Sequence, residues 1–430
     1  MRTLLRLCAV SMLSVSPTRA LAAPTFVEVA REFRDGLMWL NSDVLPALAD
    51  DGTVVFVGSR VYEEHHGAVL FSGDGSAALH ARDLSASGLS NLRSLDVNAE
   101  GQLVFVADRV AELVRRGVYT TNTSGAPVGT LHEAPYTPGE GPSDFVVSNV
   151  ALSPNGTVAF ATIVLGSGAI YRGPATGPVT ALRTGSGVFY NVRELDVNDA
   201  GQVAVQMEYT DRTAGLSRAI LLFDAPEQTL DDLDTAIERL STSVQPMPAI
   251  NASGQVAFAL NTSVTLLYFD PPGVFSSTPA RTIALAPGVY VATPTPWGEP
   301  NEITQYASAA GAYASFGRVD INDAGLVAFQ ATLDSGGFGV FTGPSPSLHK
   351  VLAAGDMVGS QRIAWVGLSE LNNEGELTLV TTDFASADRQ VWRVGNLPRP
   401  LTLARPRAWP WPWLDPAPCR IPCAPRRWLP

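Results

Sequence analysis

Three segments of the chain bring acidic and amide side chains together at the spacing of a cation-binding loop. They are Asp96-Val-Asn-Ala-Glu-Gly101, Asp196-Val-Asn-Asp-Ala-Gly201 and Asp320-Ile-Asn-Asp-Ala-Gly325. A calcium loop needs oxygen ligands at alternating positions and an acidic ligand at its twelfth position. That position holds Ala107, Met207 or Ala331, and the residues after each glycine, which would form the second half of a calcium loop, have the pattern of an apolar strand. We therefore interpret the segments as structural turns, with calcium as the weaker alternative, and predict no metal site and no cofactor.

The histidines do not have the spacing of a metal or catalytic centre. His80, His132 and His349 occupy equivalent positions of a repeat, which favours a structural role. The segment Tyr62-Glu-Glu-His-His66 clusters histidine with carboxylates, but zinc proteases place two histidines four residues apart on a helix, so a solvated loop is the better interpretation. The sequence contains no nucleophile elbow, phosphate loop or dinucleotide fingerprint. We predict no catalytic residue, because one sequence does not single out a pair of carboxylates.

The three acidic segments belong to a repeat of the form Asn-x-x-Gly-x-Val-Ala-Phe. The Asn side chain is expected to bond its own backbone in a tight turn, and Gly supplies a positive φ. The strand after Gly is apolar on both faces, which predicts burial between neighbouring sheets. The clearest structural turn residues are Asn98, Gly101, Asn198, Gly201, Asn251, Gly254, Asn322, Gly325, Asn372 and Gly375. With Gly52 and Gly156, the seven anchoring glycines are 49, 55, 45, 53, 71 and 50 residues apart.

A second strand follows each turn and carries an aromatic residue. These residues are Phe71, Tyr119, Tyr171, Phe223, Tyr268, Phe341 and Trp392. A third strand follows, and a fourth leads into the next turn, so each unit holds about four short antiparallel strands. Units of this size are typical of β-propeller blades. We predict an all-β fold, a β-propeller of seven blades, with an open β-solenoid or stacked sandwiches as the alternative.

A propeller must close its ring, and the two ends of the repeat region can share one blade. Phe26–Ala30 and Leu37–Leu40 have the pattern of the third and fourth strands of a unit that lacks its first half. The last unit supplies two strands near Leu377 and Val391, so the two ends are predicted to complete each other. The alternative uses Pro400–Leu403 as the third strand.

The beginning of the chain has the features of a secretory signal peptide. Arg2 and Arg6 precede an apolar stretch from Leu7 to Val15, and Ala20-Leu-Ala22 is a small-x-small cleavage site. The apolar stretch is too short to span a bilayer. We predict that residues 1–22 are removed and that the protein lies outside the cytoplasm, as a secreted, periplasmic or cell-surface protein without a transmembrane segment.

Charge and cysteine usage narrow the classes of partner. The formal charge is −12, and residues 1–22 and 397–430 are both basic, which leaves about −20 on residues 23–396. Such a body repels nucleic-acid phosphates, so we predict no nucleic-acid partner. Apart from Cys8 in the signal peptide, the cysteines are Cys419 and Cys423, so the repeats must be stabilised by packing alone.

The Asn-x-x-Gly-x-Val-Ala-Phe repeats resemble those of bacterial secreted tandem-repeat proteins, many of which end in a C-terminal anchoring signal. The resemblance covers about residues 24–396. It implies a propeller-like fold and export, but it implies no activity. The chain departs from this pattern in residues 397–430, which are rich in Pro, Arg and Trp and show no sorting helix. The predicted organisation is a signal peptide (1–22), a propeller (23–396) and a disordered tail (397–430).

One spacing in the repeat is longer than the others. The 71 residues between Gly254 and Gly325 predict an insertion at about 287–316 that contains Trp297, Tyr306 and Tyr313. Binding residues gather on the loops of rigid scaffolds, so these three aromatic residues are the candidate binding site. The alternative is a tolerated surface insertion without a ligand. Residues 230–240 have the charge pattern of a short surface helix.

These features predict a binding protein, not an enzyme. The expected partner is an extracellular protein or a glycan. The alternative is a polysaccharide hydrolase or lyase with carboxylates around the central channel of the propeller. A third interpretation is a purely structural protein of the envelope or matrix.

Overall fold

The computed structural model describes most of the repeat region. The described residues are 23–32, 37–40, 44–60, 69–76, 78–110, 114–133, 145–164, 167–186, 189–211, 215–223, 236–240, 248–268, 281–293, 302–310, 312–343 and 348–397. Residues 1–399 form one compact unit and residues 400–430 another. All the described residues belong to the first unit.

The described chain forms seven blades of antiparallel strands, as predicted. Blade 1 contains β2 (Leu37–Leu40) and β3 (Ala47–Leu48), which both pair with β4 (Val54–Arg60), then β5 (Val69–Gly73) and β6 (His80–Asp83). Blade 2 contains β7 (Leu89–Val97), β8 (Gln102–Val110), β9 (Val114–Asn122) and β10 (Gly129–Glu133). The short 3-10 helix η1 (Ser85–Ser87) precedes β7.

Blades 3 and 4 follow the same order. Blade 3 contains β11 (Phe145–Leu152), β12 (Thr157–Val164), β13 (Ser167–Pro174) and β14 (Thr180–Ser186). Blade 4 contains β15 (Phe189–Val197), β16 (Val203–Asp211), β17 (Gly215–Phe223) and β18 (Ala236–Leu240). Residues 236–240 are therefore a strand, and the predicted helix is wrong there; residues 230–235 lie outside the described residues.

Blades 5 to 7 complete the ring. Blade 5 contains β19 (Ala249–Ile250), β20 (Val256–Leu260), β23 (Gly288–Thr293) and β24 (Glu302–Ser308). Blade 6 contains β25 (Tyr313–Ile321), β26 (Val327–Leu333), β27 (Phe338–Thr342) and β28 (His349–Ala353). Blade 7 contains β30 (Gln361–Leu371), β31 (Leu377–Asp383), β32 (Arg389–Gly395) and β1 (Thr25–Arg31), while β29 (Met357–Val358) pairs with the start of β30.

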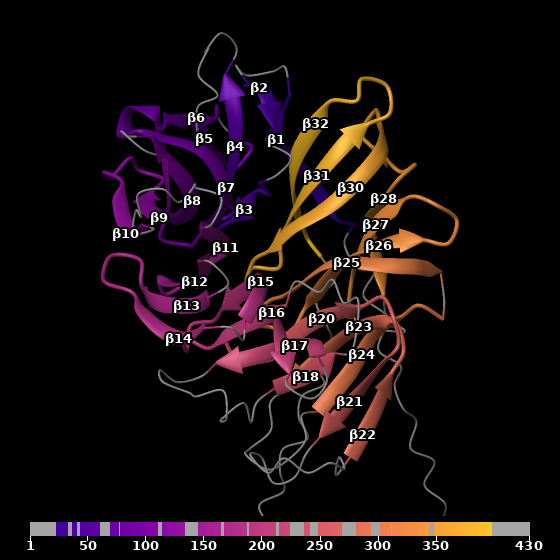
Figure 1. Cartoon of the computed structure of the whole chain (residues 1–430). Coiled ribbons are helices and arrows are strands. Elements are labelled where there is room, and N and C mark those ends of the chain that lie inside the picture. Colours follow the sequence, from indigo (N-terminus) through magenta and orange to yellow (C-terminus); the bar gives the residue numbers. More distant parts are fainter. Residues whose placement is uncertain are drawn as a thin grey trace, which may run out of the picture. The chain divides into compact units, whose positions relative to one another are not determined.

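The ring closes by the predicted sharing of one blade. The N-terminal β1 pairs antiparallel with β32, from Thr25 opposite Gly395 to Arg31 opposite Gln390, and the two strands lie side by side in Figure 1. The second N-terminal strand, β2, pairs with β4 and belongs to the inner side of blade 1. Pro400–Leu403, the alternative closing strand, lies outside the described residues.

The repeat seen in the sequence is offset from the blade by one strand. The Asn-to-Gly turn joins the innermost strand of a blade to the second strand of the same blade, as between β7 and β8. The fourth strand of each sequence repeat is thus the first strand of the next blade. Every blade except blade 7 is therefore built from a continuous stretch of chain, and blade 7 depends on β1.

The hydrophobic core is divided into seven clusters, one at each interface between neighbouring blades of the described chain. The second strands fill these interfaces because both of their faces are apolar. Phe105, Phe160, Phe258 and Phe329 are completely buried, and so are the residues before them, which are Ala in three of the four strands and Val104 in the other. The predicted burial of the post-glycine strand is confirmed, and its small residue allows the adjacent sheet to approach closely.

Five of the seven predicted aromatic residues lie directly opposite the buried residue of the second strand. The stacked pair Phe160 and Tyr171, with ring centroids 5.1 Å apart, is an example. Phe223 lies in β17, the second strand after its turn as predicted, but it pairs with Val203 and not with Val205. One assignment is wrong. Tyr268 is not in the blade at all, and Tyr290 stacks on Phe258 in its place, at 5.8 Å.

The misplaced Tyr268 reveals where the extra residues of blade 5 lie. Strands β21 (Val264–Tyr268) and β22 (Arg281–Leu285) pair with each other and form a hairpin between β20 and β23. The predicted insertion at 287–316 is wrong, because this stretch supplies β23, β24 and the first part of β25. A hairpin strand of the pattern Val-Thr-Leu-Leu-Tyr has the same alternation as a blade strand, so the sequence alone does not separate them.

In the part of the chain that the structure describes, no helix is long and apolar enough to cross a membrane.

Candidate functional site: the central channel

The Asn-to-Gly turns have the predicted local geometry. Asn98 accepts hydrogen bonds on Oδ1 from the backbone nitrogens of Glu100 and Gln102, at 3.1 and 3.0 Å. All seven anchoring glycines have φ between 72° and 84°. A residue with a Cβ is strained in this left-handed region, which explains the glycine.

The same asparagines also link neighbouring blades, which the sequence did not reveal. The Nδ2 of Asn98 donates to the carbonyl of Pro154 in the next blade, at 3.2 Å. Equivalent bonds run from Asn198 to Asn251, from Asn251 to Asn322, from Asn322 to Asn372 and from Asn372 to Ala49, at 2.9, 3.2, 3.2 and 3.1 Å. The last of these joins blade 7 to blade 1. These bonds join blade 2 to blade 3 and run without a break from blade 4 through blades 5, 6 and 7 to blade 1.

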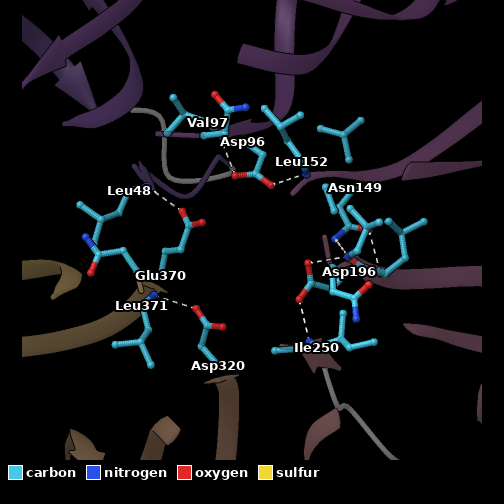
Figure 2. A pocket seen from close by; sticks show the side chains of 18 of the residues that line it. Leu48, Asp96, Val97, Asn149, Leu152, Asp196, Ile250, Asp320, Glu370 and Leu371 are labelled. Atoms are coloured by element: carbon cyan, nitrogen blue, oxygen red, sulfur yellow. Dashed lines mark hydrogen bonds between the residues drawn. The ribbon is translucent and has the colours of Figure 1, made fainter. Parts of the chain in front are cut away.

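Two residues before the turn, a carboxylate makes a second link between blades. Asp96 Oδ1 accepts from its neighbour Val97, and Oδ2 accepts from the backbone nitrogen of Leu152 in the next blade, at 2.6 Å. Asp196 and Asp320 repeat this arrangement with Ile250 and Leu371, at 2.8 and 2.7 Å. Glu370 Oε2 accepts from Leu48 of blade 1, at 2.7 Å. Figure 2 shows the four carboxylates pointing toward one cavity from different blades.

The carboxylates lie in alternate blades, except that blades 6 and 7 are neighbours and both carry one. Blades 1, 3 and 5 carry Ala47, Ala151 and Ala249 at this position, and blades 2, 4, 6 and 7 carry the acids. Seven positions cannot alternate without one repeated neighbour, and here the neighbours are Asp320 and Glu370. These two acids therefore face the cavity from adjacent blades.

The cavity has a volume of about 810 Å³ and lies among the inner strands of all seven blades. Burial raises the pKa of Asp96 and Asp196 to about 7, although their bonds from backbone nitrogens partly oppose the shift. Burial raises the pKa of Asp320 to about 6, and the charge of Arg318 acts against this rise. Burial, followed by repulsion from Asp96 and Asp320, raises the pKa of Glu370 well above its usual range.

Two further side chains in the cavity are not used to link blades. Burial raises the pKa of Glu194, which makes no hydrogen bond with the described residues. The buried Nε of Arg318 has no hydrogen-bond partner in the described chain. The other arginine that lines the cavity, Arg93, lies 3.8 Å from Asp108. An unpaired buried N–H group is costly, so the Nε of Arg318 is a donor on a cavity-lining residue for which a ligand can supply the acceptor.

The geometry separates linking groups from groups that are free to bind. Both carboxylate oxygens of Asp96, Asp196 and Asp320 already accept backbone N–H groups, which supports the predicted turn chemistry and leaves them poorly placed as calcium ligands. Among the described residues, no group of three or more His, Cys, Asp or Glu side chains is arranged to hold a metal ion. Glu194, Arg318 and Glu370 remain as the candidate binding residues.

The structure places the predicted aromatic site differently. Trp297 lies outside the described residues. Tyr306 lies in β24, half-buried against the core between blades 5 and 6, and burial raises its pKa. Tyr313 lies at the start of β25 and contacts Phe316 and Phe341, with ring centroids at 5.5 and 5.1 Å. The two tyrosines are engaged in packing within the propeller and do not form an exposed surface together.

The histidines of the repeat lie on outermost strands, as their common position indicated. His80, His132 and His349 belong to β6, β10 and β28. His132 packs against Phe160 and Tyr171 of the next blade, at 5.6 and 4.8 Å, and burial lowers its pKa. The segment 62–66, with the adjacent histidines, lies outside the described residues.

The sequence held a signal for the channel that the turn interpretation obscured. The residue two before the turn alternates between Ala and an acid, and a buried inner strand has no local need for an acid. An acid at a repeated buried position indicates a partner from another repeat. No repeated pattern in the sequence indicates that Glu194 and Arg318 line the same cavity, because each occurs in one blade only.

No protein-family model and no curated protein matches the chain. Among solved structures, the chain is similar to the polysaccharide lyase Uly1, with 8% identity, 81% of this chain and 88% of that chain covered, and a TM-score of 0.46. It is also similar to prolyl oligopeptidase B from Galerina marginata, with 9% identity, 84% and 49% covered, and a TM-score of 0.49. An acylaminoacyl peptidase from Pyrococcus horikoshii matches with 10% identity, 82% and 52% covered, and a TM-score of 0.45. This chain spans about half the length of the two peptidases.

Proposed function

We propose that this protein is an exported, non-enzymatic β-propeller that binds a sugar unit of an extracellular glycan in its central channel. The observation that carries the proposal is the Arg318 guanidinium, whose buried Nε lacks a partner in the described chain while facing a cavity of about 810 Å³. The proposed roles are donation of a hydrogen bond by Arg318 and exchange of hydrogen bonds by Glu194 and Glu370.

The chemistry of the cavity favours a hydroxyl-rich ligand over a charged one. A hydroxyl group can accept from a guanidinium and donate to a carboxylate, so one sugar can satisfy both kinds of side chain. An anion would be attracted by Arg318 but repelled by the ionised fraction of the surrounding acids. A peptide amine would pair with the acids but leave Arg318 without an acceptor. The absence of a catalytic motif in the sequence supports binding without turnover.

The test is a glycan array with the full chain, followed by titration of the best ligand. We expect Arg318→Gln to weaken binding at least about tenfold, as expected for loss of a buried charged hydrogen bond. Arg93→Gln is the matched control, because Arg93 lines the same cavity but pairs with Asp108. Equal affinity of the wild type and Arg318→Gln for every glycan bound would remove the channel as the site.

A second function has its own supporting observation. Glu194 and Glu370 are carboxyls with raised pKa values that face the same cavity. A carboxyl that stays protonated near neutral pH can act as a general acid, and an ionised partner can act as a base. This arrangement favours a polysaccharide hydrolase or lyase as the alternative function.

Turnover separates the two functions. Incubation of the full chain with a panel of polysaccharides, followed by detection of new reducing ends, tests for catalysis. Glu370→Gln keeps an oxygen that can accept from Leu48, so the link to blade 1 is retained. Turnover that this variant abolishes would establish the enzyme; binding without turnover would leave the binding function standing.

A further inference from the structure

The end of the propeller opposite the Asn-to-Gly turns carries a cluster of exposed apolar side chains. Phe338, Met357 and Phe384 are 36%, 58% and 60% exposed, and they are the large hydrophobic residues that the described chain leaves exposed. Phe338 begins β27, Met357 begins β29, and Phe384 follows β31. Because the strands are antiparallel, all three positions lie at the same end of blades 6 and 7. Single exposed apolar residues are ordinary, but three from separate segments at one end are not.

The cluster is assembled on the first residues of β30. Trp365 contacts Phe338 edge to face, with ring centroids 6.2 Å apart and planes at 66°. The guanidinium carbon of Arg362 lies 5.1 Å from the centre of the Phe384 ring. Met357 pairs directly with Arg362 across the β29–β30 hairpin. Two aromatic platforms therefore flank one short strand segment.

A pocket of about 520 Å³ opens beside the Phe384 platform. Arg31, Ser360, Gln361, Arg362, Asp383 and Phe384 line this pocket. Arg31 is held in place by two hydrogen bonds to Glu28, at 3.0 and 2.6 Å. Gln361 Oε1 is buried and has no hydrogen-bond partner among the described residues. A buried acceptor that no donor of the described chain reaches, on a residue that lines a pocket, indicates that a donor comes from a ligand.

We propose that this end of blades 6 and 7 is a second carbohydrate-binding site, which binds a neutral polysaccharide chain. The face of an aromatic ring is electron-rich and attracts the C–H groups that line one face of a sugar. A sugar hydroxyl would donate to Gln361 Oε1, and other hydroxyls would accept from Arg31 and Arg362. A sugar unit supplies both an apolar face and closely spaced hydroxyl donors.

Other classes of ligand fit less well. A docking protein would need a continuous apolar area, whereas here the rings are separated by arginine and aspartate side chains. Nucleic acid is disfavoured by the charge of about −20 on residues 23–396. The site does not depend on the channel proposal, because it uses none of the side chains of the channel and lies at the opposite end of the blades.

The test uses the full chain in affinity gel electrophoresis with soluble β-glucan, xylan and galactomannan. We expect at least one polysaccharide to retard the wild type, and Phe384→Ala and Trp365→Ala each to weaken retardation roughly tenfold, since each removes a ring face. Met357→Ala removes apolar area but no ring, so it should weaken retardation less than either ring variant does. Thr123→Ala, at an exposed position beside the turn of blade 2 at the other end of the blades, is the control and should bind as the wild type does.

Three results would overturn the proposal. The first is no retardation of the wild type by any of the three polysaccharides. The second is equal weakening by Met357→Ala and Phe384→Ala, which would indicate a general apolar contact. The third is a concentration-dependent dimer, measured by light scattering, that Phe384→Ala dissociates, which would indicate a second copy as the occupant. Binding lost in Phe384→Ala but retained in Arg318→Gln would support this site and contradict the channel.

Discussion

The two ends of the blades differ in how strictly the sequence is constrained. At the turn end, seven glycines share one backbone conformation, and asparagine and aspartate side chains link blades 2, 4, 5, 6 and 7 each to the next blade. At the opposite end, blade 5 extends into the β21–β22 hairpin, blade 7 begins with the β29–β30 hairpin, and Phe384 projects from an exposed turn. A hydrogen bond between neighbouring blades constrains the residues of both blades. The sequence at the turn end must therefore repeat from blade to blade, whereas the sequence at the loop end can differ between blades.

This difference suggests a division of labour within one scaffold. The turn end holds the ring together, and the side chains proposed to bind a ligand there are Glu194 and Arg318, which depart from the repeat, and Glu370, which accepts from Leu48 through Oε2. The loop end contributes little to ring closure, so its irregular residues can serve recognition at small cost in stability. Each of the following variants tests one side of this division.

Removal of β1 should have the largest effect. Deleting residues 23–32 takes away the outermost strand of blade 7 and the buried Glu32, which accepts from Leu40 and Arg389 at 2.8 and 3.1 Å. It also removes Val29 and Ala30 from the cluster between blades 7 and 1. We expect loss of the cooperative thermal transition in calorimetry and broadening in gel filtration.

A peptide of residues 23–32, added in trans, is the control for this deletion. Partial recovery of the transition would assign the defect to the missing strand. A deletion variant that melts at the wild-type temperature would show that the links at the turn end close the ring without β1, and that the shared blade is dispensable.

The turn end itself is tested at Asn372, which joins blade 7 to blade 1. Asn372→Ala removes the turn bond to Glu376 and the link to Ala49, so we expect a loss of about 2 kcal/mol in the free energy of unfolding. Asn372→Ser imitates blade 3, where Ser153 Oγ accepts from Thr157 at 3.1 Å. It should retain the turn and lose only the link, at a cost of about 1 kcal/mol.

Denaturant unfolding of the two variants separates the contribution of the hydrogen bond within the turn from that of the hydrogen bond to blade 1. If Asn372→Ser is as stable as the wild type, the bonds between blades contribute nothing measurable to stability. The asparagine would then be explained by its hydrogen bond within the turn alone. If both variants are equally destabilised, the serine does not restore the turn.

The turn, the buried strand and the number of blades follow from the sequence because each depends on local chemistry. Asn, Gly and the apolar pair after them lie within eight residues, and the same pattern recurs seven times. The strand β1 was also predictable, since Phe26 to Ala30 has strand alternation and the last repeat is incomplete. These conclusions required no knowledge of which segments meet in space.

The channel and the loop-end cluster were not predictable for the opposite reason. Asp96, Asp196, Asp320 and Glu370 are up to 274 residues apart in the chain and meet only when the ring closes. The sequence around each carboxylate accounts for it as part of a turn. It gives no indication that the same carboxylate also accepts a hydrogen bond from the next blade. The aromatic residues Trp365, in β30, and Phe384, directly after β31, belong to no shared motif. Their contact with one strand segment is a property of the fold.

The channel carboxylates predict a pH dependence of stability. Folding raises the pKa of Asp96 and Asp196 to about 7 and of Asp320 to about 6, from an unfolded value of about 4. The folded state therefore binds more protons than the unfolded state between these values, and stability increases as the pH falls from about 8 to about 5. We expect the melting temperature in calorimetry to rise by at least about 2 °C over this range.

An Asp196→Asn variant sharpens this prediction. The amide oxygen can still accept one backbone N–H, and the side chain no longer titrates, so the rise in melting temperature between pH 8 and pH 5 should become smaller. Asp51→Asn, at an exposed position in the turn of blade 1, is the matched control and should keep the full dependence. A melting temperature that falls with pH over this range would contradict the assigned direction of the pKa shifts.

The smallest effect on stability is expected at the loop end. Phe384 is 60% exposed, so Phe384→Ala should change the free energy of unfolding by less than about 0.5 kcal/mol. The matched variant is Phe341→Ala in blade 6, where the side chain is 7% exposed and stacks on Phe329 at 5.6 Å, and where truncation should cost about 3 to 5 kcal/mol. Urea unfolding of both variants measures the contrast. If Phe384→Ala destabilised the protein as strongly as Phe341→Ala, the ring would be part of the core, and its exposure would not be available for recognition.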